Sequence, residues 1–210
     1  MLAKLLSLNK PNKYWQNIRL AAQALRSGRI VAFPTETVYG LGVCADNDSA
    51  VDSLCRVKQR PRQKELSIMI AEPEDVAKYV KHIPPIARRL ISSFWPGPLT
   101  IIFDLPGGRT VGIRNSSKCV VRDLLKTAGI PIVSTSANIT GMPPATDAKQ
   151  VIEFFADKVD IVLDGGTAEG GKPSTVVKIL DDTFEIIRNG LIEEERLNRC
   201  LNEDCLSIRP

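Results

Sequence analysis

The sequence predicts a single α/β domain built on a mixed sheet of about seven strands. Short apolar runs of strand length recur along the chain, and segments with apolar residues at helical spacing separate them. Two of these runs, Ile30–Phe33 and Ile130–Val133, continue directly into clusters of polar residues. The chain has 210 residues and an apolar share of 43%, which suits one substantial core. We expect the core to cover roughly 12–190, followed by a helical tail over 191–210.

The first quarter of the chain predicts a helix, a strand and a second helix. Asn12–Ser27 carries apolar residues at helical spacing and ends at a glycine, the usual residue of a left-handed helix cap. Ile30–Phe33 has the length of a covered strand, and Pro34 stops it because proline lacks the backbone donor that a strand ladder needs. Asn47 is a suitable cap for the next helix.

The rest of the chain continues the alternation, after a cationic loop over 56–64. Prolines open two of the predicted helices, and a glycine closes a third. The predicted helices are Pro73–Val80, Pro84–Ser93, Ser117–Ala128 and Val151–Phe155, and the predicted strands are Leu66–Ile70, Leu99–Phe103, Val111–Arg114, Ile130–Val133 and Ile161–Leu163, with a hairpin of Val176–Ile179 and Phe184–Arg188.

Composition excludes several classes of function. The single histidine, His82, lies in a predicted surface loop, so neither a histidine base nor a His-rich metal site is expected. The five cysteines are scattered and form no C-x-x-C pair, which indicates reduced thiols rather than disulfides or a zinc site. No run has the length of a membrane span and the amino terminus lacks a signal-peptide core, so we expect a cytoplasmic protein. The formal charge of +4 suits an anionic ligand of any size.

Polar residues gather where the predicted strands end. Ile30–Phe33 leads into Thr35, Glu36, Thr37 and Tyr39, and in open α/β sheets ligands bind at the carboxyl ends of strands. Taken alone, this stretch fits an ordinary turn as well as a pocket wall. Hydroxyls at three predicted strand ends, combined with basic side chains, nevertheless indicate an anion site for phosphates and a carboxylate. The hydroxyls are on Thr37, Ser134, Ser136, Ser174 and Thr175, and the cations are Lys58, Arg60, Lys64, Arg114 and Arg188.

Two rival sites are rejected. Gly166–Lys172 fits the G-x-x-x-x-G-K pattern of a phosphate-binding loop, but Pro173 stands where the metal-binding hydroxyl should be, and a strand-like segment follows instead of a helix. Ser134–Asn138 is not a nucleophile elbow, and the chain offers no choice of histidine base. We therefore expect the hydroxyls to bind a ligand rather than to attack it.

Six separated motifs follow one another along the chain: Ala32–Gly42, Lys58–Pro61, Trp95–Thr100, Ser136–Asn138, Ser174–Val177 and Ile187–Gly190. In this order they resemble the YrdC/TsaC family, the threonylcarbamoyl-AMP synthases of tRNA modification. The similarity extends from about Trp15 to Gly190. The fold that it implies is a twisted open α/β sheet flanked by helices, with a concave basic face.

The resemblance also implies a reaction and its partners. L-threonine takes up bicarbonate or carbon dioxide as an N-carbamate, which attacks the α-phosphate of ATP, and pyrophosphate leaves. The product is passed to a threonylcarbamoyl-transfer complex of TsaD/TsaB/TsaE-like proteins, which modifies tRNA that reads ANN codons. Mg²⁺ is expected with the ATP. Such chemistry needs a close encounter and neutralised phosphate oxygens more than an acid–base residue, which fits a chain with one histidine.

Motif positions carry the family's site residues onto this chain. A K-x-R and S-x-N tetrad at the phosphates and bicarbonate would comprise Lys58, Arg60, Ser136 and Asn138. Threonine would be held by Thr37, Arg114, Ser134 and Ser174, with Arg114 pairing its carboxylate. ATP would be surrounded by Arg60, Lys64, Thr110, Ser136, Pro144 and Arg188.

Two departures and two alternatives accompany the resemblance. Many relatives with a C-terminal extension carry histidine where this chain has Met69, and the chain ends soon after Gly190, as in the short single-domain type. One alternative is a tRNA-binding or double-stranded RNA-binding module without catalysis, although aromatic residues are only 5% of the chain and the hydroxyls would then be idle. The other is the paralogous YciO type, against which the intact tetrad argues.

Overall fold

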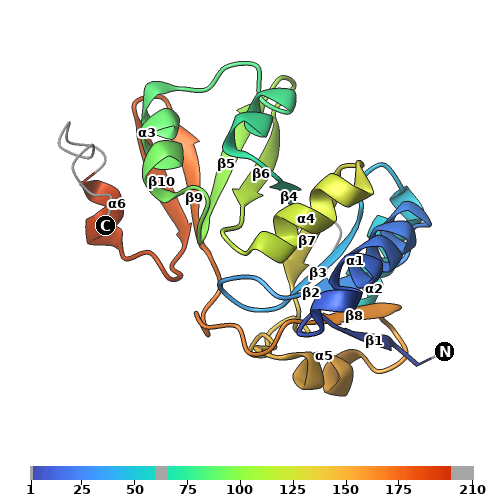
Figure 1. Cartoon of the computed structure of the whole chain (residues 1–210). Helices are drawn as coiled ribbons and strands as arrows, with labels where there is room; N and C mark the ends of the chain where they lie inside the picture. The colour runs from blue at the N-terminus through green and yellow to red at the C-terminus, as the bar shows by residue number, and fades with distance from the viewer. Residues whose placement is uncertain (1, 60–65, 200–210) are drawn as a thin grey trace.

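The computed structural model describes residues 2–59 and 66–199 (Figure 1). The predicted site residues Arg60 and Lys64 lie outside these residues, as does the end of the predicted tail. Figure 1 shows a twisted open sheet with helices on both of its faces. The fold class predicted from the sequence is therefore confirmed.

The described residues form one sheet of ten strands in the order β1-β8-β2-β3-β7-β4-β6-β5-β9-β10. The sheet is mixed, since β2 pairs antiparallel with β3 and parallel with β8. The prediction of about seven strands was too low: the eight segments named from the sequence all contain strands, and β1 and β3 were not recognised. The strands are β1 Lys4–Ser7, β2 Val31–Phe33, β3 Gly40–Cys44, β4 Ser67–Ile70, β5 Leu99–Leu105, β6 Arg109–Asn115, β7 Ile132–Ser136, β8 Ile161–Asp164, β9 Thr175–Leu180 and β10 Thr183–Arg188.

The helices begin and end close to the predicted residues. The Asn47 side chain accepts a hydrogen bond from the Ala50 amide and caps α2, and Gly129 ends α4 with a left-handed φ of 62°. The predicted helix at Pro73 is a short 3₁₀ helix, η1. The helices are α1 Pro11–Arg26, α2 Asp48–Val57, η1 Pro73–Lys78, α3 Pro85–Phe94, α4 Cys119–Ala128, α5 Ala148–Phe155 and α6 Glu194–Asn198.

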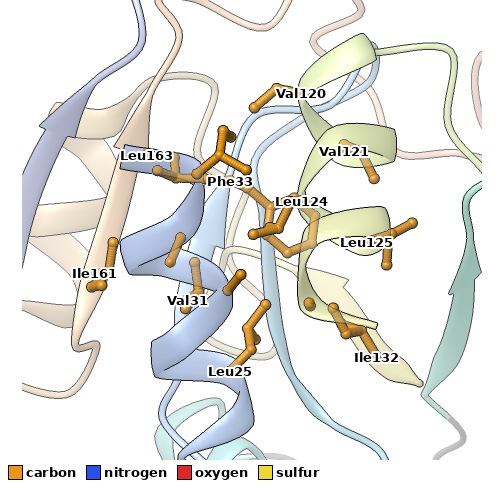
Figure 2. Packing of buried hydrophobic residues seen from close by; sticks show 14 of the residues in the cluster. Leu25, Val31, Phe33, Val120, Val121, Leu124, Leu125, Ile132, Ile161 and Leu163 are labelled. Atoms are coloured by element: carbon orange, nitrogen blue, oxygen red, sulfur yellow. The ribbon is translucent and has the colours of Figure 1, made fainter. Parts of the chain in front are cut away.

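Helices α1 and α4 lie side by side on one face of the sheet (Figure 1). Their apolar side chains, including Leu25 and Leu124, pack on Val31 and Phe33 of β2 (Figure 2). Because strand side chains alternate between faces, Ala32 points the other way, into a cluster with residues of α2 and α5. The two helix layers thus cover opposite faces of the same strands.

The face that carries α1 and α4 continues from β3 toward β9, with Ile132 of β7 and Met69 of β4 still packed in the cluster of these two helices. Strand register places residues in two rows across it, and the first row consists mostly of glycines and serines. One row runs Gly42, Ser134, Ser67, Gly112 and Ile102, and the other runs Ile132, Met69, Arg114, Thr100 and Val176. A row of glycines and serines leaves a hollow where larger side chains would fill the face.

Candidate functional site

A pocket of about 540 Å³ lies over these rows. Its lining combines small residues with eight hydroxyl-bearing residues and two guanidinium groups. Two other pockets, of about 520 and 450 Å³, are nearly as large, so volume does not distinguish them. What distinguishes the first pocket is the set of hydroxyl and guanidinium donors that converge in it. The polar lining residues are Ser67, Thr100, Ser134, Ser136, Ser174, Arg114 and Arg188, together with Thr35, Thr135 and Tyr39.

Arg114 is fixed by the turn between β2 and β3. Its Nη2 donates to Glu36 Oε1 at 2.8 Å and to Thr37 Oγ1 at 2.8 Å. The Ser116 hydroxyl donates to the second oxygen of Glu36. The Arg114 Nε is buried and has no partner among the described residues, and such a donor is the kind of group that an ordered water or a ligand oxygen satisfies. The guanidinium is therefore held in place before any ligand arrives.

Thr37 lies behind Arg114 rather than in the pocket lining, and none of its surface is exposed. Its hydroxyl hydrogen-bonds the Thr35 hydroxyl at 2.7 Å, and Thr35 in turn donates to the Val38 carbonyl at 2.6 Å. The structure thus brings Thr37 to the site as a support for Arg114. Direct contact of Thr37 with a ligand stays a prediction.

Ser174 joins the two predicted subsites. Its Oγ lies 2.9 Å from the Thr100 hydroxyl, and Arg188 Nη2 donates to Ser174 O at 2.8 Å and to Ser174 Oγ at 3.1 Å. The chain after β10 packs directly behind this contact. A Cβ on Gly190 would lie 2.3 to 2.5 Å from backbone atoms of residues 173–175, so only glycine fits there.

Lys58, Ser136 and Asn138 meet beside the pocket. The Lys58 ammonium, in a residue only 2% exposed, donates to the Ser136 carbonyl and to Asn138 Oδ1, the latter at 3.0 Å. Ser136 Oγ donates to the same amide oxygen at 2.6 Å. Three members of the predicted tetrad are therefore together, and the fourth, Arg60, lies outside the described residues.

Two predicted ATP residues are not part of the pocket lining. Thr110 shares a face of β6 with Gly112 and Arg114, but it stands two residues before the first of these and does not reach the pocket. Pro144 is half-buried in the loop between β7 and α5. The sequence had indicated that Ser134 and Ser136 follow the end of a strand, but both lie within β7. Both line the pocket, and because they are two positions apart along the strand, they lie on the same face of the sheet.

Sequence reasoning gave no site role to Ser67 or Thr100, whereas Tyr39 was expected at the end of the strand Ile30–Phe33, and all three residues line the pocket. Ser67 and Thr100 begin or nearly begin strands, and their place in the rows depends on pairing with β6. The Tyr39 hydroxyl donates to Gly166 O at 2.8 Å and accepts from the Gly165 amide at 3.2 Å. Burial raises the pKa of Tyr39 to about 12, so the phenol keeps its proton and ties the glycine-rich loop to the β2–β3 turn.

The glycine-rich loop and the histidine behave as predicted. The segment from Gly166 to Lys172 leads into strand β9 and not into a helix, which confirms that it is not a phosphate-binding loop of the Walker type. His82 is exposed between η1 and α3. Among residues 2–59 and 66–199, no helix combines the length and apolar character needed to cross a bilayer.

Comparison with known proteins gives the same family. The Sua5/YciO/YrdC family model, whose description is "Telomere recombination", matches residues 23–190. The threonylcarbamoyl-AMP synthase of Pyrococcus abyssi is 37% identical over 195 residues, which are 89% of this chain and 57% of that protein. This chain therefore spans less than two thirds of that relative.

Two solved structures have the same fold. P. abyssi Sua5 complexed with L-threonine aligns with a TM-score of 0.87 at 33% identity, over 97% of this chain and 62% of that one. Escherichia coli YciO aligns with a TM-score of 0.82 at 26% identity, over 91% of this chain and 98% of that one. The residues that the family model matches include all six motifs. This chain belongs to the Sua5/YciO/YrdC family.

Proposed function

We propose that this protein is a threonylcarbamoyl-AMP synthase. It condenses L-threonine, bicarbonate or CO₂, and ATP into threonylcarbamoyl-AMP and pyrophosphate. The observation that carries the proposal is the pocket over the sheet, where a pre-positioned arginine faces a set of hydroxyls. The P. abyssi relative is named for this activity, and the similar P. abyssi Sua5 was solved in complex with L-threonine.

In the proposed complex, Arg114 pairs the carboxylate of L-threonine through its positive charge and through the guanidinium hydrogens that Glu36 and Thr37 do not take. Ser134 and Ser174 offer hydroxyls to the rest of the amino acid, and Thr37 supports Arg114 from behind. Attack of the amine on carbon dioxide forms an N–C bond and releases a proton. Holding amine and carbon dioxide in contact supplies most of what this step needs.

The adenylyl transfer takes place beside the tetrad. A carbamate oxygen attacks the α-phosphorus, the bond to the β-phosphate oxygen breaks, and pyrophosphate leaves. Lys58, Arg60, Ser136 and Asn138 would neutralise and orient the phosphates and bicarbonate, and Lys64, Thr110, Pro144 and Arg188 would complete the ATP site. The Lys58 contacts hold Ser136 and Asn138 together, so this side of the site is rigid.

Magnesium is proposed to arrive with ATP. The described residues contain no group of three or more His, Cys, Asp or Glu side chains that could hold a metal ion. The pocket's hydroxyls and guanidinium groups can bind phosphate oxygens, so a Mg²⁺ would be held mainly by the phosphates and by its own waters. Bound there, the ion would offset the charge of the leaving pyrophosphate.

The product is proposed to pass, in the cytoplasm, to a threonylcarbamoyl-transfer complex of TsaD/TsaB/TsaE-like proteins, which modifies tRNA. The test is pyrophosphate release from ATP and magnesium, with and without L-threonine and bicarbonate. Release that requires both additions supports the proposal. No release, together with salt-sensitive binding of tRNA, would reject it in favour of an RNA-binding module.

A further inference from the structure

We propose that Glu36 is a positioning residue, whose carboxylate holds the Arg114 guanidinium in the orientation that receives the carboxylate of an amino-acid substrate. The inference rests on the proposed function, in which Arg114 binds that carboxylate. Arg114 lines the pocket and Glu36 does not, so Glu36 acts through Arg114.

Glu36 is fixed from both its side chain and its backbone. One carboxylate oxygen accepts from Arg114 at 2.8 Å, and the other accepts from the Ser116 hydroxyl. Its backbone oxygen accepts from the Gly170 amide at 3.1 Å. A Cβ on Gly170 would lie 2.7 Å from that oxygen, so the glycine-rich loop closes tightly on the turn. Glu36 is therefore a rigid anchor rather than a side chain that follows the arginine.

The anchor sets the plane of the guanidinium. An arginine Nη2 carries two hydrogens, and here Glu36 takes one and Thr37 takes the other. The Arg114 side chain is only 11% exposed and that of Glu36 only 16%, so water screens the pair weakly. An arginine already held in one orientation loses less side-chain freedom when it binds a carboxylate. Glu36 should thus favour ligands with a carboxylate over ligands without one.

The experiment measures binding by calorimetry for L-threonine and for L-threoninamide, which lacks the carboxylate. In Glu36→Ala, the dissociation constant for L-threonine should rise roughly 10- to 100-fold, the range expected for losing a charge-assisted hydrogen bond, while that for L-threoninamide changes little. Glu36→Gln keeps an oxygen acceptor but not the charge and should show a smaller rise. Glu153→Gln, an exposed carboxylate on α5, is the matched control and should equal the wild type.

If Glu36→Ala fails to fold, Ser116→Ala tests the same arrangement, because it removes the hydroxyl that holds the second oxygen of Glu36. Ser116→Ala should weaken the binding of L-threonine but not that of L-threoninamide, and by a smaller factor than Glu36→Ala does. An equal loss of affinity for both ligands would overturn the proposal, since it indicates a general structural defect. Tighter binding of L-threonine by Glu36→Gln would also overturn it, because Glu36 would then only compete with the ligand for Arg114.

The binding assay separates this inference from the proposed function. Carboxylate-specific binding that depends on Glu36, in a protein that releases no pyrophosphate, keeps the inference and rejects the function. Threonine-dependent pyrophosphate release, together with L-threonine affinity that does not change when Glu36 is replaced, supports the function and rejects the inference. A wild-type protein that does not bind L-threonine rejects both.

Discussion

Replacing Thr100 with valine tests whether the hydroxyl pair at the pocket floor orients the Ser174 side chain. Thr100 is only 3% exposed, and its hydroxyl lies 2.9 Å from Ser174 Oγ. Valine keeps nearly the same shape, so the change removes one hydrogen bond between neutral groups. Such a bond contributes about 0.5–1.5 kcal/mol net. We expect the free energy of unfolding to fall by about 1 kcal/mol, which lowers the melting temperature of a chain this size by about 2–4 °C.

The same substitution should weaken the threonine subsite. Ser174 keeps its contact with Arg188 at 3.1 Å, so the residue stays in place while its hydroxyl loses one of two fixed partners. A loss of about 1 kcal/mol in substrate binding corresponds to a roughly fivefold higher KM for L-threonine. The KM for ATP should change less.

Thermal melting and threonine-dependent pyrophosphate release measure the two effects of Thr100→Val. Thr183→Val is the matched control, because Thr183 is exposed at the start of β10 and valine suits a strand. A melting temperature that falls while the KM for L-threonine stays at the wild-type value would refute the orienting role of Thr100. An unchanged melting temperature would refute the hydrogen bond itself.

Three further substitutions test the packing, the capping and the ligand assignment. Gly42→Ala should lower the free energy of unfolding by about 1–3 kcal/mol, since its Cβ would lie 2.8 Å from the buried Phe33 ring; an unchanged denaturant midpoint would contradict this. Asn47→Ala should lower the free energy of unfolding by about 1 kcal/mol, because the Ala50 amide loses its capping acceptor. The KM values for L-threonine and for ATP should not change, and denaturation and kinetics together check this. Arg114→Ala should raise the KM for L-threonine far more than that for ATP, and equal increases would mean that the subsites are misassigned.

Local sequence signals predicted most of the elements. The Asn47 cap, the glycine at the end of α4 and the proline after β2 act within a few residues, so the sequence reveals them directly. Strand β3 was missed because Gly40 and Gly42 are typical of turns. In the structure these glycines give room to the Phe33 ring, which comes from the neighbouring strand β2.

The site was predicted in its residue types but not in its connections. The resemblance indicated Arg114, Ser134 and Ser174, and the structure brings them to one pocket. The ion pair of Arg114 with Glu36 joins residues 78 apart, and the contact of Thr100 with Ser174 joins residues 74 apart. Such contacts depend on strand order and register, which no local pattern encodes.

The most direct test of the account is to detect the product by mass spectrometry after incubating the protein with ATP, magnesium, L-threonine and isotopically labelled bicarbonate. The account predicts threonylcarbamoyl-AMP that carries the label. It also predicts that Arg114→Ala forms little of this product at a threonine concentration that saturates the wild type, while Glu153→Gln forms it normally. Absence of labelled product from the wild type, or undiminished product from Arg114→Ala, would contradict the claim that this pocket is the site of the reaction.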